Sequence, residues 1–260
     1  NEKRKRKKFG FKPFDIKQLQ ALFAPDAFAK LSPHARWAAV LGLYTGSRAS
    51  EVGQLLTTDI VDMDGTPAIR ITDEGEDQKV KTEASLRTVP IHADLITLGF
   101  LDYIKSLSAD DWRVFPNGNP KAKNGQGNWI SKAFSAHVAR NGASWPKAKR
   151  GFHSLRKSFI QEAQGFGMAS EMRVQIVGHE FDDEHHATYS RDFTAAEKLN
   201  GMRAKGFKTP GMKAINYGLD LEGLRPLLTA SVNSKPAKVP GRKESSSAKA
   251  RKRVSTSGKR

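Results

Sequence analysis

Histidine, acidic and tyrosine side chains crowd into residues 177–193, VGHEFDDEHHATYSRDF. Histidine and carboxylate groups are common metal ligands, so a metal-dependent hydrolase is one interpretation of this segment. Helical zinc sites, however, prefer ligands four residues apart, whereas His185 and His186 are adjacent and His179 lies six residues earlier. We therefore expect no metal here, and His179 and Tyr189 are the two candidate residues of the segment; the ordinary alternative is that either is a satisfied core or surface residue.

Two arginines elsewhere in the chain have surroundings that suit a phosphate group. Arg48 follows a helix end at Gly46, a residue that allows the tight turn needed to aim the side chain away. Arg156 lies three residues after His153, so both share one face at the start of a helix. A guanidinium fork and a helix N-terminus both favour phosphate. The ordinary alternative for Arg48 is that it caps its helix or pairs with Glu51. The ordinary alternative for His153 and Arg156 is that they form a polar helix face.

Together these side chains form a set that could transfer a phosphoryl group at DNA without a metal. Two arginines can neutralise the charge that develops on the non-bridging oxygens. A tyrosine hydroxyl, whose ordinary pKa is about 10, needs a neighbouring base such as His153 before it can attack. Lys81, near the tip of a predicted hairpin, could give a proton to the leaving 5′ oxygen. The full set comprises Arg48, Lys81, His153, Arg156, His179 and Tyr189.

The hydrophobic periodicity predicts a mainly helical body that positions these groups. The stretch 32–46 has Ser32 as N-cap, Pro33 at the first helical position and Gly46 as its C-terminal stop. Residues 66–72 and 85–91 predict an antiparallel hairpin or small sheet around an acidic turn. Further helices are predicted at 49–56, 92–107, 128–142, 153–163, 170–178, 183–191 and 194–204. The predicted fold class is therefore mainly α with a small antiparallel β-sheet (α+β).

The net charge of +17 is concentrated at the two ends of the chain. Residues 1–12 carry a net +6 and residues 231–260 a net +9, which leaves +2 for the 218 residues between them. Such basic ends favour a polyanion, most simply nucleic acid, through counterion release. A solubilising tail that never meets DNA is the alternative. Large apolar residues nearly vanish from residue 232 onward, so we expect the last segment to be disordered.

Four segments resemble motifs of the catalytic domain of tyrosine recombinases, the phage-integrase family, and they occur in the order of that family. They are YTGSRASEVGQLLTTDI (44–60), KTEASLRTVPIH (81–92), HSLRKSF (153–159) and VGHE…TYSR (177–191). The resemblance covers roughly residues 14–190, and four motifs in order are far more specific than any one of them. It implies the tyrosine recombinase catalytic-domain fold.

The resemblance also implies a role for each member of the set. Arg48 and Arg156 look like the two catalytic arginines, Lys81 like the hairpin lysine that acts as general acid, and Tyr189 like the nucleophile. The remaining assignments are His153 and His179 as the two histidine positions, Glu51 and Asp59 as acidic supports of Arg48, and Lys79, Lys157 and Arg191 as DNA-binding residues.

The activity that the resemblance implies is site-specific recombination of DNA, as in the integration or excision of a phage or genomic island. Enzymes of this family cut one strand at a time, form a 3′-phosphotyrosyl bond and pass it to a partner strand. The covalent bond conserves the phosphodiester energy, so we expect neither ATP nor a metal cofactor. The expected partners are double-stranded DNA, other copies of the chain in a tetramer, and accessory directionality or DNA-bending proteins.

Three features depart from the family pattern. Ten residues separate His179 from Tyr189, one more than the family interval. Lys157 stands where a histidine is frequent, and about seventy residues follow Tyr189. Within that tail, AINYGLDLEGLRPLL (214–228) has enough leucine to pack on the body or on a neighbouring subunit.

We divide the chain into four parts. Residues 1–12 are a basic interdomain linker, 13–205 the catalytic domain, 206–230 a packing segment that subunits could exchange, and 231–260 a basic disordered tail. The smaller N-terminal domain with which the family clamps DNA has no counterpart in this sequence, so we expect a catalytic-domain fragment.

The absence of cysteine excludes disulfides and thiolate metal sites and fits a reducing compartment. No apolar run approaches the length of a membrane span, and no signal peptide follows the basic N-terminus. We expect no membrane contact and a cytoplasmic, nucleoid-associated protein of a bacterium.

Two alternative functions remain open at this point. A type IB topoisomerase uses a closely related catalytic set but relaxes supercoils, and assembly of a two-site complex would separate the two activities. A DNA-binding protein that has lost catalysis is the other alternative. All six chemical positions are filled, so the sequence does not favour that loss.

Overall fold

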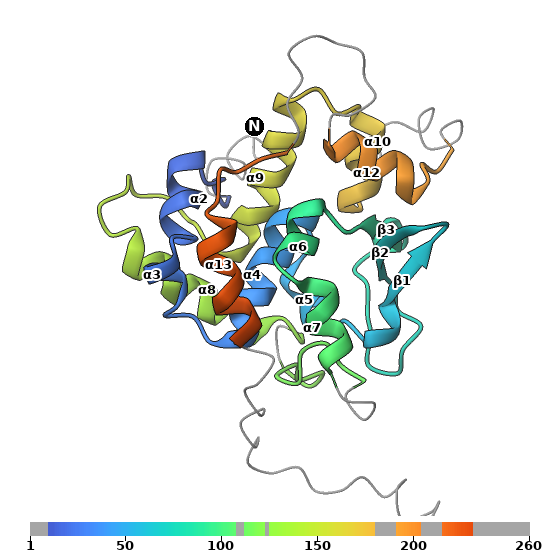
Figure 1. Cartoon of the computed structure of the whole chain (residues 1–260), viewed down its shortest axis with the longest axis horizontal. Helices are drawn as coiled ribbons and strands as arrows, with labels where there is room; N and C mark the ends of the chain where they lie inside the picture. The colour runs from blue at the N-terminus through green and yellow to red at the C-terminus, as the bar shows by residue number, and fades with distance from the viewer. Residues whose placement is uncertain (1–9, 108–111, 123–124, 180–190, 204–214, 231–260) are drawn as a thin grey trace, which may run out of the picture.

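Most of the molecule is helical, and one small sheet lies at its side (Figure 1). This computed structural model describes residues 10–107, 112–122, 125–179, 191–203 and 215–230. The described helices are α2 (Ile16–Leu22), α3 (Pro25–Phe28), α4 (Pro33–Thr45), α5 (Ala49–Gly53), α6 (Ala93–Thr97), α7 (Phe100–Ser106), α8 (Asn128–Asn141), α9 (Phe152–Gly165), α10 (Ser170–Val177), α12 (Ala195–Arg203) and α13 (Leu221–Thr229). The strands are β1 (Ile60–Met63), β2 (Thr66–Ile71) and β3 (Arg87–Pro90), with short 3-10 helices η1 (Thr57–Asp59) and η2 (Glu83–Ser85). The predicted fold class is confirmed.

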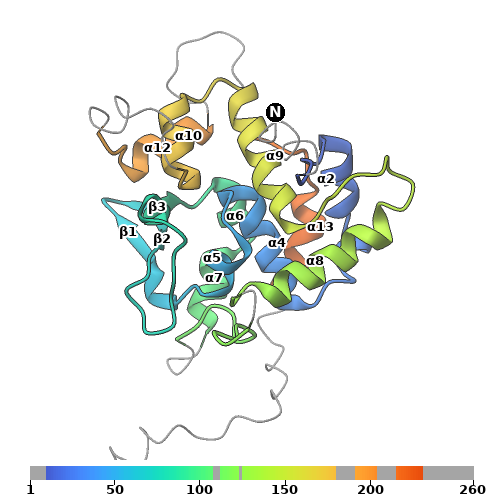
Figure 2. The ribbon, with the colours of Figure 1, turned by 180° about the vertical axis from the view of Figure 1, so that it is seen from behind.

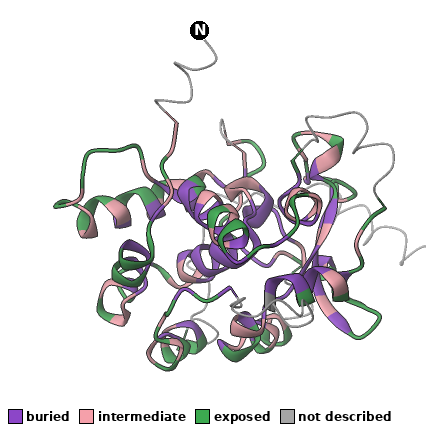
Figure 3. Ribbon diagram, turned by 90° about the horizontal axis from the view of Figure 1, so that it is seen from above, coloured by how far each residue is buried: buried purple, intermediate pink, exposed green. Residues whose placement is uncertain are grey.

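Buried residues gather in the middle of the molecule (Figure 3). The helix α4 forms the centre of this core. Ten of the thirteen residues of α4 are buried, as expected for a helix that other elements surround. It packs against α9 and α8, against α5 which follows it, and against α13. Pro33 occupies the first turn as predicted, and Gly46 ends the helix with a φ of 63° that favours glycine.

The three strands form an antiparallel sheet in the order β1-β2-β3, with Ile69 of β2 between Ile60 and Val89. Figure 2 shows the sheet from behind, with α10 and α12 beside β3. The predicted hairpin of 66–72 and 85–91 is confirmed as the pair β2 and β3. Strand β1 was not predicted, because it is a four-residue edge strand whose last two residues are exposed. Asp64 and Gly65 join it to β2 with positive φ angles, as in a tight hairpin turn.

Two predicted helices have different limits in the structure. The stretch 92–107 is two helices, α6 and α7, because Gly99 between them has a φ of 90° that no continuous helix allows. The helix predicted at 49–56 ends at Gly53, and the chain then turns into η1 and the sheet. The helix predicted at 183–191 lies outside the described residues except for Arg191. The other predicted helices are present within one or two residues of their expected ends.

The segment 215–230 packs on the body of its own chain. Leu224 and Leu228 of α13 are fully buried, and α13 lies against α3, α4 and α6. Tyr217 donates to the carbonyl of Leu43 at 3.2 Å, and Arg36 donates to the carbonyl of Leu227 at 2.8 Å. These bonds fix the end of the described chain to α4, the helix that ends just before Arg48. Among the described helices, none is long and apolar enough to cross a membrane.

Candidate active site

Arg48 lies at the turn between α4 and α5. Its backbone N–H donates to Glu51 Oε2 at 2.8 Å, and its Nη1 contacts Glu51 Oε1 at 2.5 Å. Its other donors reach the Ser85 hydroxyl and the carbonyl of Gly178, both at 3.2 Å. Arg48 therefore pairs with Glu51, as one of the ordinary alternatives stated, and it occupies the N-cap position of α5. Its side chain also reaches the hairpin connection and the end of α10. Its side chain remains 25% exposed.

Arg156 is one of the largest fully buried side chains, with 1% of its surface exposed. The apolar residues of α9 around it, Phe152, Leu155 and Phe159, turn into the core as the sequence predicts. Its Nη1 donates to the carbonyl of Gly46 at 2.7 Å. Its Nη2 is buried and has no hydrogen-bond partner within the described part of the chain. A buried donor without a partner is costly, so this nitrogen is suited to receive an acceptor from a ligand.

His153 begins α9 on the exposed side of the helix, one turn before Arg156. Its ring packs against Phe11 in a T-shaped contact, with 5.5 Å between the ring centroids. The pKa of His153 is lowered to about 4, first by partial burial and then by repulsion from four cations, Arg156, Lys157, Arg48 and Lys81. The imidazole is therefore neutral at pH 7 and able to accept a proton.

His179 leaves α10 at its C-terminal end. Gly178 ends the helix with a φ of 64°, and the His179 N–H donates to the carbonyl of Val174 at 3.2 Å. The pKa of His179 is lowered to about 4, first by partial burial and then by the charges of Arg156, Arg48, His153 and Arg87. A second neutral imidazole thus stands among the same arginines.

Lys81 is exposed and belongs to the connection 72–86 between β2 and β3. The connection is fixed to the body before it reaches Lys81. Gln78 donates to Asp59 Oδ2 at 2.7 Å, and the backbone N–H of Lys79 donates to Gln54 Oε1 at 3.1 Å. The ammonium group of Lys81 is close enough to His153 to lower its pKa.

Asp59 supports this connection rather than Arg48, which corrects the assignment made from the sequence. It is 1% exposed and accepts from the backbone N–H of Leu56 at 2.9 Å as well as from Gln78. The physical reason is its position at the end of η1, where its carboxylate faces back to its own turn and across to the connection. Burial raises its pKa, while these two hydrogen bonds oppose the rise.

Glu51 holds two arginines, and the second of them was missed in the sequence. Arg87 Nη2 contacts Glu51 Oε2 at 2.8 Å, and both side chains are almost completely buried. Burial alone would raise the pKa of Glu51, but Arg87 and then Arg48 lower it to about 2. A signal was present in the strand, because Arg87 and Val89 occupy alternate positions and both face inward.

Five of the six predicted chemical residues are thus brought together from four segments. Arg48 comes from the α4–α5 turn, Lys81 from the connection, His153 and Arg156 from α9, and His179 from the end of α10. Tyr189 lies outside the described residues. The arrangement concentrates positive charge around two neutral histidines, which suits a phosphate group and a proton transfer beside it. In the described ranges, no group of three or more His, Asp or Glu side chains could hold a metal ion.

The predicted DNA-binding residues differ in their surroundings. Lys79 is exposed beside Lys81, and Lys157 is half-buried on α9 next to Arg156. Arg191 is exposed but forms an ion pair with Glu197 at 2.6 Å, near the start of α12. An exposed pair of this kind is weak and can be replaced by a phosphate.

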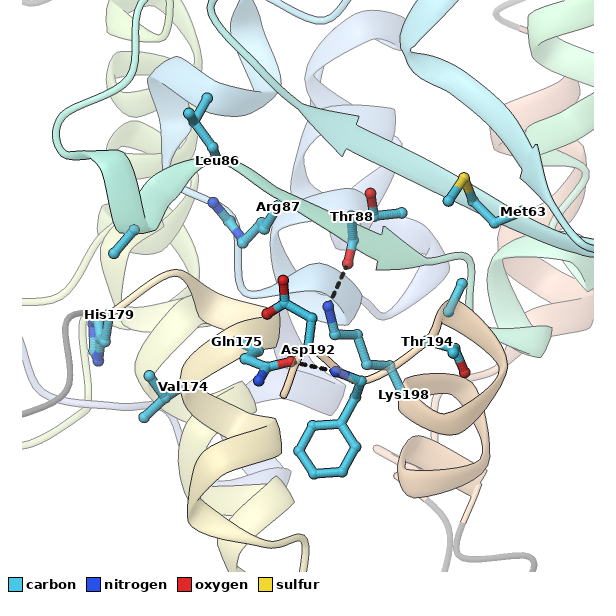
Figure 4. Close-up of a pocket in the computed structure, with 13 residues that line it drawn as sticks. Met63, Leu86, Arg87, Thr88, Val174, Gln175, His179, Asp192, Thr194 and Lys198 are labelled. Carbon is cyan, nitrogen blue, oxygen red and sulfur yellow. Dashed lines mark hydrogen bonds between the residues drawn. The ribbon is translucent and has the colours of Figure 1, made fainter. Parts of the chain in front are cut away.

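An open cavity of about 750 Å³ lies between β3, α10 and α12 (Figure 4). It lies beside the cation cluster, by which we mean Arg48, Lys81 and Arg156 with the two histidines between them. Arg87 and His179 line its wall on the side of the cluster, and Lys198 of α12 donates weakly to the carbonyl of Thr88 at 3.4 Å. Leu86 and Met63 add exposed apolar surface to it. Phosphate binding and proton transfer are assigned to the cation cluster, and the cavity lies next to it.

Solved structures share this arrangement of helices and sheet. The integrase from mycobacterium phage Brujita is similar with a TM-score of 0.50 and 15% identity, over 84% of this chain and 63% of that chain. The chain has the fold of a phage integrase. The resemblance stated from the four motifs is thereby confirmed at the level of the fold.

Two further structures are similar at lower scores. XerH site-specific recombinase bound to its difH substrate has a TM-score of 0.47 at 19% identity, covering 66% of this chain and 48% of that chain. The lambda integrase (75–356) dimer bound to a COC′ core site has a TM-score of 0.45 at 15% identity, covering 78% and 63%. The chain spans less than two thirds of each of these three proteins. No protein-family model and no curated protein matches the sequence.

Proposed function

We propose that this protein is a site-specific DNA recombinase of the tyrosine recombinase family, which cleaves and rejoins strands through a 3′-phosphotyrosyl intermediate. One observation carries the proposal. Arg48 and Arg156 meet beside two neutral histidines, and one buried guanidinium nitrogen of Arg156 has no partner among the described residues. A phosphodiester supplies the acceptor oxygens and the negative charge that this arrangement lacks. The integrase fold supports the same conclusion.

The two arginines bind the non-bridging oxygens in this proposal. Arg156 is fixed by Gly46, and Arg48 by Glu51, so both forks are oriented before the substrate arrives. Donors that are already in place stabilise the charge of the transition state without reorganising. Burial and the charges of Arg48 and Arg87 lower the pKa of Arg156 to about 9, so the guanidinium is still charged at pH 7.

The described tyrosines support Tyr189 as the nucleophile. The chain has four tyrosines, and Tyr44, Tyr103 and Tyr217 are each at most 1% exposed. Their hydroxyl groups donate to Asp94, to the carbonyl of Val114 and to the carbonyl of Leu43. Burial raises the pKa of Tyr44 and of Tyr217 further above the ordinary value. These three phenols are poor nucleophiles for a DNA strand, which leaves Tyr189.

Strand cleavage then follows as one displacement at phosphorus. The Tyr189 hydroxyl oxygen attacks the phosphorus, and its proton passes to the neutral imidazole of His153. The bond from phosphorus to the 5′ oxygen breaks, and Lys81 gives a proton to that oxygen. His179 donates a hydrogen bond to the phosphate. Attack by the 5′ hydroxyl of a partner strand reverses these steps, releases Tyr189 and joins the strands, so no external energy source is consumed.

The finer assignments belong to the same proposal. The substrate is double-stranded DNA, and two cleaved sites are exchanged within an assembly of several copies of the chain. Integration or excision of a mobile element is the process that this chemistry serves. The basic ends of the chain, with net +6 and +9, add affinity for the DNA backbone.

Covalent capture tests the proposal with DNA of random sequence, so that the target site is found in the same experiment. The full chain is incubated with a library of nicked duplex DNA, in which cleavage releases a short fragment that carries the new 5′ hydroxyl, so the cleaved strand cannot be rejoined. After denaturation in detergent, DNA that remains attached to protein is recovered and sequenced. The proposal expects enriched sequences with wild type and none with Tyr189→Phe, although both proteins bind DNA. Absence of covalent DNA with wild type, under conditions where it binds, would refute it.

The recovered site then separates recombination from simple relaxation. Two duplexes that carry the site should be joined into recombinant products. Relaxation of a supercoiled plasmid without any recombinant product would instead identify a topoisomerase activity.

A further inference from the structure

Arg87 is a buried cation whose hydrogen bonds reach three separate segments. Its side chain is 3% exposed. Its Nε donates to the carbonyl of Ile176 at 2.7 Å, its Nη1 to the carbonyl of Ser85 at 2.8 Å, and its Nη2 to Glu51 Oε2 at 2.8 Å. Burying a charge is costly unless its hydrogen bonds are satisfied, and here each nitrogen of the planar fork has a partner.

Each of these bonds ends beside a candidate catalytic residue. Ile176 lies three residues before His179, in the last turn of α10. Ser85 lies in η2, four residues after Lys81. Glu51 holds Arg48 through both its backbone and its side chain. One side chain therefore joins the three segments that supply these groups.

The link from Arg87 to Arg48 passes through a single carboxylate. Glu51 Oε2 accepts from Arg87 Nη2 and from the Arg48 backbone, while Oε1 accepts from Arg48 Nη1. Without Arg87, the buried carboxylate would lose the partner that contributes most to keeping it charged. A carboxylate that rotates or takes up a proton no longer fixes the fork of Arg48.

The link to α10 is close as well. A methyl group added to Gly178 would lie 2.9 Å from Arg87 Nη1 and 2.9 Å from the carbonyl oxygen of Ala84. The glycine thus lets the end of α10 approach the strand closely enough for Arg87 to reach Ile176. Gly178 in turn offers its carbonyl to Arg48 Nη2 at 3.2 Å.

We propose that Arg87 is a positioning residue of the strand-transfer reaction, which acts through Glu51 on Arg48 and through Ile176 on His179 without contacting DNA. This inference rests on the proposed function. It assigns separate effects to the guanidinium geometry of Arg87 and to its positive charge. The fork of Arg87 sets the geometry of the segments, and its charge keeps Glu51 ionised.

Two variants separate these properties, and Arg36 supplies the matched control. Arg87→Lys keeps the charge but loses the fork, and Arg87→Gln loses both. Arg36 is another arginine that ties distant segments through carbonyl groups, those of Leu227 and Ala29, at 2.8 and 2.6 Å. Arg36→Lys and Arg36→Gln therefore show how the loss of hydrogen bonds between distant segments affects stability and cleavage when those segments carry no catalytic residue. Thermal unfolding of all four variants identifies those that fold.

The first readout is the rate of covalent adduct formation at saturating concentrations of the captured DNA, together with the dissociation constant for that DNA. Replacing a group that orients a metal ligand commonly costs about 10- to 100-fold in activity, and we take the same range for a group that orients a catalytic arginine. We expect a loss of that size for Arg87→Lys and a larger one for Arg87→Gln, with dissociation constants within about threefold of wild type. The Arg36 variants should cleave at the wild-type rate. Folded Arg87 variants that cleave like wild type would overturn the inference.

The second readout is the dependence of the cleavage rate on pH. Glu51 is close to three cations: Arg48 from the α4–α5 turn, Arg87 from β3 and Arg156 from α9. His179 is close to the same three cations and to His153. Removal of the Arg87 charge raises the pKa of both groups. The acid limb of the rate should therefore move to higher pH in Arg87→Gln but stay in place in Arg87→Lys. An acid limb that moves equally in Arg87→Lys and Arg87→Gln would contradict the proposal that the charge of Arg87, and not its geometry, keeps Glu51 ionised.

The third readout does not depend on activity, so it distinguishes this inference from the proposed function. Amide hydrogen exchange of the free protein should quicken at residues 48–51 and 176–179 in both Arg87 variants and in neither Arg36 variant. Unchanged exchange there would overturn the inference. If wild type forms no covalent adduct, the proposed function fails, and the exchange result still decides whether Arg87 positions these two segments.

Discussion

Arg156 Nη1 donates a hydrogen bond to the carbonyl of Gly46 at 2.7 Å, across 110 residues of sequence. The bond fixes one candidate catalytic arginine to the turn that lies two residues before the other. Because the second amino group of Arg156 is buried and unpaired within the described ranges, the pair is arranged for an anion. This relation between α9 and the end of α4 is the structural basis of the proposed phosphate site.

Replacement of Arg156 should therefore affect the chemistry far more than the binding of DNA. Arg156→Lys keeps a charge but loses the fork, and we expect the cleavage rate to fall about 100- to 1,000-fold, which is typical of removing a preorganised donor. The dissociation constant should change by no more than a few fold. Arg225→Lys, at an exposed position of α13, is the control. Equal losses in binding and cleavage would mean that Arg156 only holds the duplex.

Lys81 should be dispensable when the leaving group needs no proton. A substrate with sulfur in place of the bridging 5′ oxygen releases a thiolate, whose conjugate acid has an ordinary pKa of about 8.5. We expect Lys81→Ala to cleave ordinary DNA much more slowly than wild type and to cleave the sulfur substrate at nearly the wild-type rate. Lys105→Ala, at an exposed lysine of α7, should cleave both substrates at the wild-type rate. A Lys81 variant that is equally slow on both substrates would exclude its role as general acid.

Gly178→Ala should destabilise the protein more than an alanine at another glycine with positive φ. The left-handed conformation costs an alanine about 1–2 kcal/mol at either site. At Gly178 the new methyl group would also meet Ala84 and Arg87 at 2.9 Å, whereas at Gly65 nothing lies within 4 Å. Urea unfolding should show a larger loss for Gly178→Ala, and cleavage should slow because the Gly178 carbonyl holds Arg48. Equal losses for Gly178→Ala and Gly65→Ala would contradict the close approach.

The stability of the folded chain should fall in two stages as the pH is lowered. His153 and His179 have a folded pKa of about 4, below the ordinary 6.5, so the unfolded chain takes up their protons first and stability falls from about pH 6.5 to pH 4. Glu51 has a folded pKa of about 2, so the stability it contributes is complete above about pH 4.5 and is lost toward pH 2.

Thermal unfolding at several pH values measures the first stage directly. A double variant with Asn at His153 and His179 should lose stability less steeply between pH 6.5 and pH 4 than wild type. DNA should oppose the wild-type loss, because a phosphate favours protonated histidine. Identical slopes for the two proteins would show that these histidines are not held neutral.

Features encoded by neighbouring residues were predictable from the sequence. Gly46 and Gly178 end the helices α4 and α10, and the chain that follows them leads directly to Arg48 and His179. The spacing of His153 and Arg156 follows the helical period. The order of the motifs then allowed the fold to be named before any contact was known. These features depend on turns and periodicity, which a short stretch of chain determines by itself.

Pairings between distant segments were not predictable in the same way. Arg87 meets Glu51 across 36 residues, and Gln78 meets Asp59 across 19. Nothing in the periodicity of β3 indicates which acid its buried arginine will reach. The break at Gly99 was missed because its apolar neighbours keep helical spacing through the turn. Tyr189 lies outside the described residues, so its role stays a prediction from the sequence.

The most direct test of the account is the identity of the residue that becomes bound to DNA. After covalent capture and nuclease digestion, trypsin cleavage at Arg173 and Arg191 should release residues 174–191, a peptide whose single tyrosine is Tyr189. Mass spectrometry should find a nucleotide attached to Tyr189 through its 3′ phosphate, and no adduct in the Tyr189→Phe protein. A nucleotide on a different residue, or one attached through a 5′ phosphate, would contradict the account.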